Sequence, residues 1–172
     1  MMARLTLCPL LLVLALGTSG CGFHPLYART RANPGGQQIF NSIYVDPIEG
    51  ERAGYELRNS LIDLLRGTSR QDQAQYRLKV LVKQTIEGTA VETTGSITRY
   101  SYTLTANYEL NDIHTGARVT KGTETTVSAY DVVASPYSTL VAQQDAQKLG
   151  ARDIADRICI DLGVFFAKRS HI

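Results

Sequence analysis

The residue with the clearest chemical role is Cys21, which follows an apolar stretch and the small residues Ser19 and Gly20. Ser19-Gly20-Cys21 resembles the end of a bacterial lipobox, in which the cysteine thiol receives a diacylglyceryl group and becomes the first residue of the mature chain. Thr18 departs from this motif, where leucine is usual. The alternative is a free cysteine after a conventional signal-peptidase cut. Lipidation is favoured, because an exposed unpaired thiol is a liability in an oxidising compartment.

The segment before Cys21 has the properties of a signal peptide. Residues 5–16 carry no charge, are rich in Leu, Val and Ala, and follow the basic residue Arg4. A helix of this length spans about 18 Å, which is too short for a hydrocarbon core about 30 Å thick. We therefore expect residues 1–20 to be removed, residues 21–37 to form a lipid anchor and tether, and residues 38–172 to fold as a single domain.

The remaining cysteines leave two interpretations open. Removal of the signal peptide also removes Cys8, so the mature chain keeps Cys21 and Cys159. A disulfide between them is compatible with the sequence. However, Cys159 lies in the apolar, helical segment "DRICIDL", which favours a buried thiol. If Cys21 is acylated, Cys159 needs no partner.

Catalytic and metal-binding patterns are absent from the sequence. The three histidines, His24, His114 and His171, lie in the tether, in a turn and next to the last residue. They do not have metal-ligand spacing, and the sequence contains no HExxH, CxxC, GxSxG or SxxK motif and no phosphate-binding loop. We therefore predict a protein that is not an enzyme and that binds no metal and no cofactor.

Five cationic residues lie on strand-like segments rich in Thr and Tyr: Lys79, Lys83, Arg99, Arg118 and Lys121. Cations make charge-assisted hydrogen bonds to phosphate oxygens, so such a face can contact sugar and phosphate groups. The alternative, favoured for any single residue, is the ordinary solvent-facing side of an antiparallel sheet. The net charge of +2 is far below the basic excess of a nucleic-acid binder, so no nucleic-acid partner is expected.

Two elements come before these strands. Residues 39–45 predict a short strand, which Asp46 and Pro47 end. Residues 51–65 predict an amphipathic helix with acidic residues near its start. Its apolar side is expected to carry Tyr55, Leu61, Ile62 and Leu65, with Leu57 and Leu64 beside them.

Three runs with alternating apolar and polar residues predict an antiparallel meander over residues 76–87, 97–110 and 117–130. On the second strand the core side carries Tyr100, Tyr102, Leu104, Ala106, Tyr108 and Leu110, and on the first Tyr76, Leu78, Val80, Val82 and Ile86. On the third strand we expect Ala117, Val119, Thr123, Thr125 and Val127 to share one face, with a bulge at Lys121 and Gly122.

The last element is a long helix that starts at Pro136 with Ser135 as its cap. Gly150 weakens the middle of this helix by about 1 kcal/mol relative to alanine and is a candidate break. The element order β-α-β-β-β-α predicts an α+β fold. We expect a two-layer sandwich of a four-stranded, largely antiparallel sheet with two helices on one face.

Three stretches, "GCGFHPLY", "RYSYTLTANYEL" and "YDVVASPYSTLVAQQDA", resemble the LptE family of lipopolysaccharide-assembly lipoproteins, in its alphaproteobacterial form. The resemblance spans nearly the whole chain and keeps the same element order. It implies a non-catalytic lipoprotein anchored on the periplasmic side of the outer membrane. It also implies that the chain fills the lumen of the β-barrel LptD, helps that barrel fold, and acts with it to insert lipopolysaccharide into the outer leaflet.

The resemblance does not transfer the family's lipopolysaccharide-contacting residues directly. The loop "EGTAVETTGSI" after the second strand contains no Arg or Lys. Arg99 and Lys121 are therefore predicted contacts from their strand positions alone. A second hypothesis is a free-standing periplasmic lipoprotein that binds a small ligand or a cell-wall component.

Overall fold

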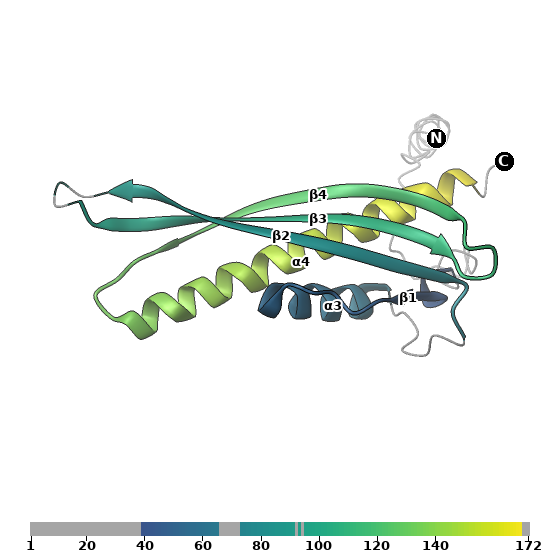
Figure 1. Ribbon diagram of the computed structural model, residues 1–172, viewed down its shortest axis with the longest axis horizontal. Helices are drawn as coiled ribbons and strands as arrows, with labels where there is room; N and C mark the ends of the chain where they lie inside the picture. Colours follow the sequence, from purple (N-terminus) through teal and green to yellow (C-terminus); the bar gives the residue numbers. More distant parts are fainter. Residues whose placement is uncertain (1–38, 66–72, 92, 94, 170–172) are drawn as a thin grey trace, which may run out of the picture. The chain divides into compact units, whose positions relative to one another are not determined.

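The computed structural model describes residues 39–65, 73–91, 93 and 95–169. The elements follow the order β1 (Ile43–Val45), α3 (Glu51–Leu65), β2 (Tyr76–Val91), β3 (Ile97–Asp112), β4 (Arg118–Asp131) and α4 (Pro136–Arg169), as Figure 1 shows. The expected signal peptide and Cys21 lie outside the described residues.

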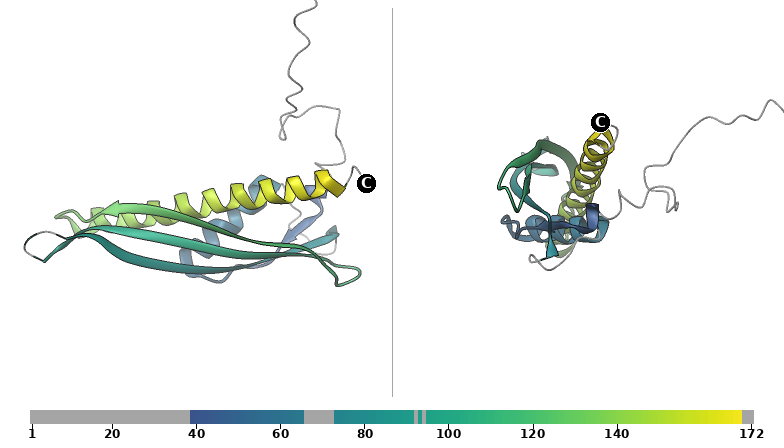
Figure 2. Two further views of the ribbon diagram at one scale, coloured as in Figure 1. Left: turned by 90° about the horizontal axis from the view of Figure 1, so that it is seen from above. Right: turned by 90° about the vertical axis from the view of Figure 1, so that its right-hand side faces the viewer.

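The four strands form one sheet in the order β1-β2-β3-β4. β1 pairs with β2 in parallel, from Ile43 opposite Tyr76 to Val45 opposite Leu78. The other two pairings are antiparallel. Both helices cover the same face of the sheet, as the two views of Figure 2 show. The predicted two-layer α+β fold is therefore confirmed.

The core lies between the sheet and the helices. Even-numbered residues of β3 from Tyr102 to Leu110 are buried, which confirms the predicted core side of this strand. On β2, burial fades along the strand: Leu78 is fully buried, whereas Ile86 is 43% exposed. The reason is that α3 begins beside Val82 and Gln84, so the second half of β2 lies beyond its cover.

The predicted strand over residues 39–45 is only partly correct. Residues 39–41 are helical, and the strand begins at Ile43. The backbone N–H and the hydroxyl of Ser42 both donate to the carbonyl of Ile39, at 3.0 and 2.7 Å. These bonds close a helical turn and place Phe40 against Phe166 of α4.

α3 has the predicted bounds, but its buried side is rotated from the expected one. The buried residues recur at spacings of three and four: Ala53, Gly54, Leu57, Leu61 and Leu65. Tyr55 is 65% exposed and Leu64 is 43% exposed, so their predicted core positions are wrong. Gly54 takes part in the buried side because the start of α3 passes close there to the backbone of Ile48 and Glu49.

The predicted core side of β4 is also wrong, except at Val119, and Ala117 is exposed and lies before the strand. Leu110 pairs with Thr120 while Asn111 pairs with Arg118, so Val119 is an extra residue in a β-bulge. The bulge exchanges the two faces of the strand. Thr126 is therefore buried and Val127 is 63% exposed. The bulge lies at Val119 and not at Lys121 and Gly122.

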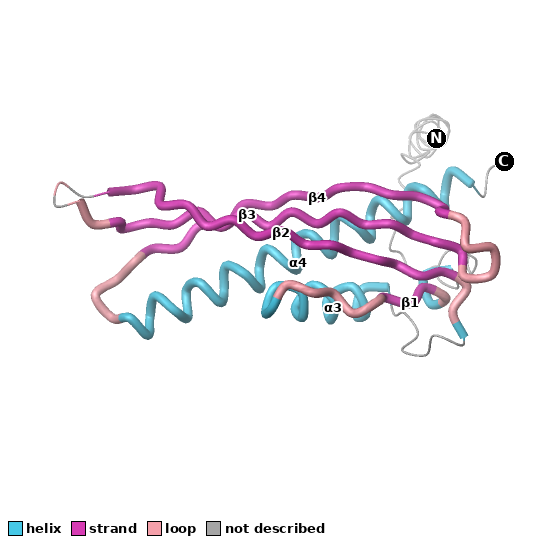
Figure 3. Tube along the Cα trace, in the orientation of Figure 1, coloured by secondary structure: helices cyan, strands magenta, loops and turns pink. Residues whose placement is uncertain are grey.

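α4 begins at Pro136 as predicted, and the backbone N–H of Ser138 donates to the Ser135 hydroxyl at 3.4 Å. The helix runs unbroken through Gly150 to Arg169, as Figure 3 shows. Gly150 marks a close approach to the sheet, because a Cβ there would lie 3.3 Å from Thr126 Cγ2 and 3.5 Å from Tyr102 Cε1. The glycine therefore serves packing and does not end the helix.

Cys159 on α4 is a free, buried cysteine, as expected from its apolar setting. Burial raises the pKa of its thiol to about 12. The thiol therefore stays protonated at neutral pH and acts as a small apolar group.

A partly buried chain of hydrogen bonds links β3, β2 and the start of α3. The Tyr102 hydroxyl donates to Gln84 Oε1 at 3.0 Å, and Gln84 Nε2 donates to the carbonyl of Gly50 at 3.0 Å. Tyr102 is fully buried, and burial raises the pKa of its hydroxyl to about 12. This chain fixes the position of the α3 start on the sheet.

Replacing Tyr102 with phenylalanine should lower the free energy of unfolding by about 1 kcal/mol, because Gln84 Oε1 loses its donor in a partly buried place. Chemical denaturation of the two chains measures the difference. Tyr137→Phe is the matched control, since that side chain is 75% exposed. Equal losses from both substitutions would show that this chain of hydrogen bonds adds no stability.

Candidate functional site: the open face of the sheet

One face of the sheet carries no helix, and we call it the open face. Its side chains alternate with the core residues along β2, β3 and β4. From the β1 end, the first four cross-strand rows are Arg77/Asn111/Arg118, Lys79/Glu109/Lys121, Leu81/Asn107/Thr123 and Lys83/Thr105/Thr125. The next rows are Thr85/Thr103/Val127, Glu87/Ser101/Ala129 and the Arg99/Asp131 pair.

The first four rows contain five cations, which we call the basic patch: Arg77, Lys79, Lys83, Arg118 and Lys121. The sequence alone indicated all of them except Arg77. The signal for Arg77 was its two-residue spacing from Lys79 on the same strand, which places both side chains on one face.

The cations of the basic patch differ in how they are paired. Arg118 Nη1 lies 3.3 Å from Glu109 Oε1, and Arg77 Nε lies 3.7 Å from Asp46 Oδ1. Lys79, Lys83 and Lys121 are exposed, and no carboxylate among the described residues forms an ion pair with them. These three ammonium groups are therefore available to an anionic ligand.

The structure does not bring the two predicted lipopolysaccharide contacts together. Arg99 and Lys121 both lie on the open face, but Lys121 pairs with Glu109 and Arg99 with Asp131. At about 3.4 Å per residue, the ten residues between Arg99 and Glu109 on β3 span about 34 Å. Arg99 also has its own carboxylate, since Arg99 Nη1 lies 3.3 Å from Asp131 Oδ1. The two residues therefore belong to separate places on the face.

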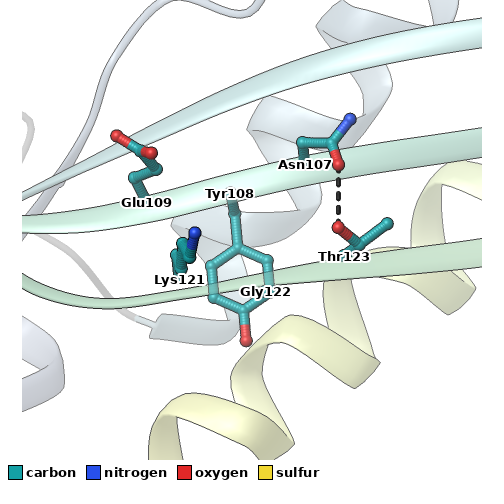
Figure 4. A pocket seen from close by; sticks show the side chains of 6 residues that line it. All are labelled: Asn107, Tyr108, Glu109, Lys121, Gly122 and Thr123. Atoms are coloured by element: carbon teal, nitrogen blue, oxygen red, sulfur yellow. Dashed lines mark hydrogen bonds between the residues drawn. The ribbon is translucent and has the colours of Figure 1, made fainter.

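A pocket of about 330 Å³ opens between β3 and β4 beside Lys121. Figure 4 shows its lining, which consists of Asn107, Tyr108, Glu109, Lys121, Gly122 and Thr123. The Thr123 hydroxyl donates to Asn107 Oδ1 at 2.7 Å, while the Tyr108 ring points the other way, toward α4. The pocket therefore offers polar groups on the open face beside Lys121, which has no ion pair with another described residue.

Gly122 makes room for the Tyr108 ring, since a Cβ on Gly122 would lie 2.6 Å from Tyr108 Cε1. Across this gap the Tyr108 hydroxyl donates to Asp161 Oδ2 of α4 at 3.0 Å. Further along β4, the Thr126 hydroxyl donates to Asp153 Oδ2 of α4 at 2.7 Å. Two residues along β4 and four residues along α4 cover the same distance, roughly 6–7 Å, so successive polar side chains of the two elements meet. A polar seam therefore ties α4 to the sheet edge.

Glu124 lies in the middle of this seam. Partial burial, then a hydrogen bond and repulsion from Asp161, raise the pKa of its carboxyl, and Arg157 opposes these effects more weakly. Asp153 behaves oppositely: the bonds from Thr126 and Arg157 lower the pKa of its carboxyl. The folded chain therefore binds a proton at Glu124 more tightly than the unfolded chain does.

This difference predicts a pH-dependent effect of Glu124→Gln. Stability from a raised carboxyl pKa is present at low pH and is lost as the pH rises through the folded value. The glutamine variant should therefore be more stable than the unsubstituted chain near about pH 7, and the gain should shrink toward about pH 4. Thermal unfolding across this range measures it. A variant that is less stable near neutral pH would mean that the attraction of Arg157 dominates.

The described residues contain neither a metal site nor a membrane-spanning helix. No group of His, Cys, Asp and Glu side chains in this part of the chain is arranged to hold a metal ion. Among the described helices, none has the length and apolar content needed to cross a membrane.

The comparison with protein families matches one family, that of lipopolysaccharide-assembly LptE, over residues 40–162. The matched residues cover more than half of the chain and run from Phe40 to Leu162 in α4. No curated protein matches the sequence.

Solved structures similar to this chain include three lipoproteins. A putative lipoprotein from Caulobacter crescentus is 29% identical, with a TM-score of 0.64 over 77% of this chain and 96% of that one. Rare lipoprotein B from Shewanella oneidensis is 13% identical, with a TM-score of 0.57 over 76% and 98%. A minor lipoprotein from Acinetobacter baumannii is 17% identical, with a TM-score of 0.52 over 72% and 92%. The last two likenesses concern the fold alone.

Proposed function

The chain belongs to the LptE family of lipopolysaccharide-assembly proteins, and on this premise we propose that it is the lipoprotein partner of the outer-membrane β-barrel LptD. In this role it catalyses no reaction. It occupies the barrel, helps the barrel fold, and takes part in placing lipopolysaccharide in the outer leaflet. The observation that carries the proposal is the family match over nearly all of the described domain, residues 40–162.

The chemistry of the open face supports a barrel partner. The lumen of an outer-membrane barrel is polar, so a domain that fills it needs a polar, hydrogen-bonding exterior. The open face presents mainly hydroxyl, amide and ammonium groups, and the Thr105 and Thr125 hydroxyls share a hydrogen bond of 3.2 Å across it. Such a face fits against polar lumen side chains over most of its rows, and Leu81 and Val127 are its exposed large apolar side chains.

The proposed anchor is a lipid on Cys21. Acyl chains on this residue would hold the domain at the periplasmic side of the outer membrane after removal of residues 1–20. The similar structure from Caulobacter crescentus is that of a putative lipoprotein, which supports this assignment.

The alternative function is that of a free-standing periplasmic lipoprotein that binds a small ligand or a cell-wall component. Isolation of the tagged chain in mild detergent separates the two functions, because only the first requires a large barrel protein to remain bound.

We also propose Arg99 and Lys121 as two separate lipopolysaccharide contacts. Lys121→Glu should weaken lipopolysaccharide binding roughly tenfold at low salt, because the substitution replaces a cation that attracts phosphate with an anion that repels it. Arg99→Glu should have a smaller effect, since Asp131 already pairs with that guanidinium. Binding of labelled lipopolysaccharide measures both, with Lys148→Glu on α4 as the control. Unchanged binding in both variants would place the contact on another surface.

A further inference from the structure

β4 is the outer strand of the sheet on the side opposite β1, as Figure 1 shows. Among the described residues, β3 is the only strand that pairs with it. Residues 123–129 form a regular stretch of β4, because the register with β3 shifts only between Leu110 and Asn111. We call the side of this stretch that is turned away from β3 the β4 edge.

One hydrogen bond shows which backbone groups point out from the β4 edge. The N–H of Val132 donates to the carbonyl of Thr98 at 2.8 Å, and these two residues lie opposite each other, one row beyond Arg99 and Asp131. Rows of an antiparallel pair alternate between hydrogen-bonded and non-hydrogen-bonded ones. The even-numbered residues of β4 therefore bond to β3. The N–H and C=O groups that point outward belong to the odd-numbered residues Thr123, Thr125, Val127 and Ala129. No hydrogen bond from another described residue reaches these outward groups.

The opposite edge of the sheet, on β2, is covered or irregular. β1 pairs with its first residues, the turn at Gly50 lies beside Val82 and Gln84, and the register shifts at Gly88 and Ala90. Charged side chains, bulges and prolines are the features that keep exposed edges from pairing. On the β4 edge, residues 123–129 contain no proline and no bulge, and their side chains on the open face are uncharged. The β4 edge is therefore the place where the sheet accepts another strand.

The polar seam beside the β4 edge has more acidic than basic groups. Glu124 of β4 and Asp153 and Asp161 of α4 share one cation, Arg157, whose Nη2 lies 3.0 Å from Asp153 Oδ2. The side chains of Arg157 and Asp153 are 49% and 44% exposed. Side chains of a strand point alternately to its two faces, so a strand added at the β4 edge directs every second side chain toward the seam. A cationic side chain there would balance the excess of carboxyl groups.

We propose that the β4 edge pairs with an extended segment of the barrel partner, which adds a fifth strand to the sheet and directs a Lys or Arg side chain toward the seam. This inference rests on the proposed function. Strands of a barrel wall already bond to one another, so the segment belongs to a loop or a chain end of the partner. The pairing lies in the plane of the sheet and leaves the open face to the lumen.

A second copy of this chain fits the β4 edge less well. Two β4 strands that pair with Lys121 opposite Asp131 have their twofold axis at Thr126, which is five residues from each. The Thr126 hydroxyl is bonded to Asp153, so the two copies of Asp153 would face each other at this axis. Charge complementarity therefore favours a basic segment of another protein.

The test maps the neighbour of the β4 edge by photo-cross-linking. A photoreactive amino acid replaces one exposed residue at a time, at Thr123, Thr125, Val127 and Ala129, in the tagged full-length chain produced in its own cells. Mass spectrometry of the isolated adducts identifies the partner residue that each position reaches. All four positions should reach one short segment of the barrel protein. Each step of two residues along β4 should move the contact by about two residues along that segment, as paired strands require.

Thr125→Pro tests the backbone bond. The N–H of Thr125 points away from β3, so proline leaves the pairing with β3 intact but removes an outward donor. Thr125→Val is the matched control, because it keeps the N–H and, like proline, lacks the hydroxyl that contacts Thr105. With the photoreactive residue at Val127, the yield of cross-link should fall about tenfold in the proline chain and stay unchanged in the valine chain. Circular dichroism should show the same fold for both chains.

Cross-links scattered over several barrel strands would overturn the inference, and so would cross-links to another copy of this chain. A wall strand that merely lies over the open face would keep its cross-link in the Thr125→Pro chain, which would also overturn it. If the proline chain does not fold, the order of the four cross-links in the otherwise unsubstituted chain decides. Failure of the proposed function looks different, because no barrel protein would then remain with the unsubstituted chain. That result overturns both proposals, whereas a bound barrel without ordered cross-links overturns only the strand pairing.

Discussion

Replacing Gly54 with alanine should lower the free energy of unfolding by at least about 2 kcal/mol, whereas the same change at Gly150 should alter it by less than about 1 kcal/mol. Both glycines are buried in helices, so both gain about 1 kcal/mol of helix propensity from the methyl group. The difference between them comes only from the atoms that the new Cβ would meet.

At Gly54 those atoms belong to the backbone. A Cβ would lie 2.7 Å from the carbonyl oxygens of both Ile48 and Glu49, which form the turn into α3. The turn cannot move aside easily, because the carbonyl of Gly50 accepts a hydrogen bond from Gln84 and Gly50 packs against Val82. The substitution therefore displaces the start of α3 from the sheet.

At Gly150 the nearest atom is the Thr126 methyl group, which would lie 3.3 Å from the new Cβ, and a side chain can shift by a few tenths of an ångström. Chemical denaturation of the two variants measures the contrast. Equal destabilisation would contradict this account of the α3 start, and so would a neutral effect of Gly54→Ala.

The second large effect is expected from Cys21→Ser, which should abolish incorporation of labelled palmitate and membrane retention through the anchor. A serine hydroxyl cannot form the thioether that holds the diacylglyceryl group. Metabolic labelling and fractionation of cells that produce the variant measure both consequences. The matched control is Cys159→Ala, since Cys159 is buried on α4 and its thiol stays protonated.

The control variant should keep the label of the unsubstituted chain. Two results would contradict lipidation at Cys21: label that persists in the Cys21→Ser chain, or an unmodified Cys21 in the mass of the mature N-terminus.

The fold class could be predicted from the sequence because periodicity and end signals are local. The bounds of α3 and the start of α4 at Pro136 follow from caps and apolar spacing within a few residues. The core side of β3 follows in the same way, since its alternation from Tyr102 to Leu110 is uninterrupted.

The errors arose where a contact distant in sequence decides the outcome. The alternation of residues along β4 does not show which of its two faces is buried. Only the pairing with Leu110 and Asn111 reveals the bulge at Val119. The buried position of Gly54 similarly depends on the turn at Ile48 and Glu49.

The candidate surface shows the same limit. The sequence identified most cations of the open face, but the separation of Arg99 from Lys121 depends on strand register. Register also places Arg77 and Arg118 in one row, on the two sides of Asn111, and creates the basic patch at the β1 end. Neither arrangement is encoded in residue spacing along one strand.

The central claim is that this lipoprotein works as the partner of an outer-membrane barrel. The chain is tagged at its C-terminus, produced in its own cells at native level, and extracted in mild detergent without cross-linking. The Gly54→Ala chain serves as a destabilised control, and the Lys148→Glu chain as a control with an unaltered open face.

Co-isolated proteins are identified and their ratio to the tagged chain is measured. We expect one large β-barrel protein in a fixed ratio with the unsubstituted and Lys148→Glu chains, and a smaller amount of it with Gly54→Ala. Isolation of the folded, lipidated chain without a barrel protein would contradict the proposed function.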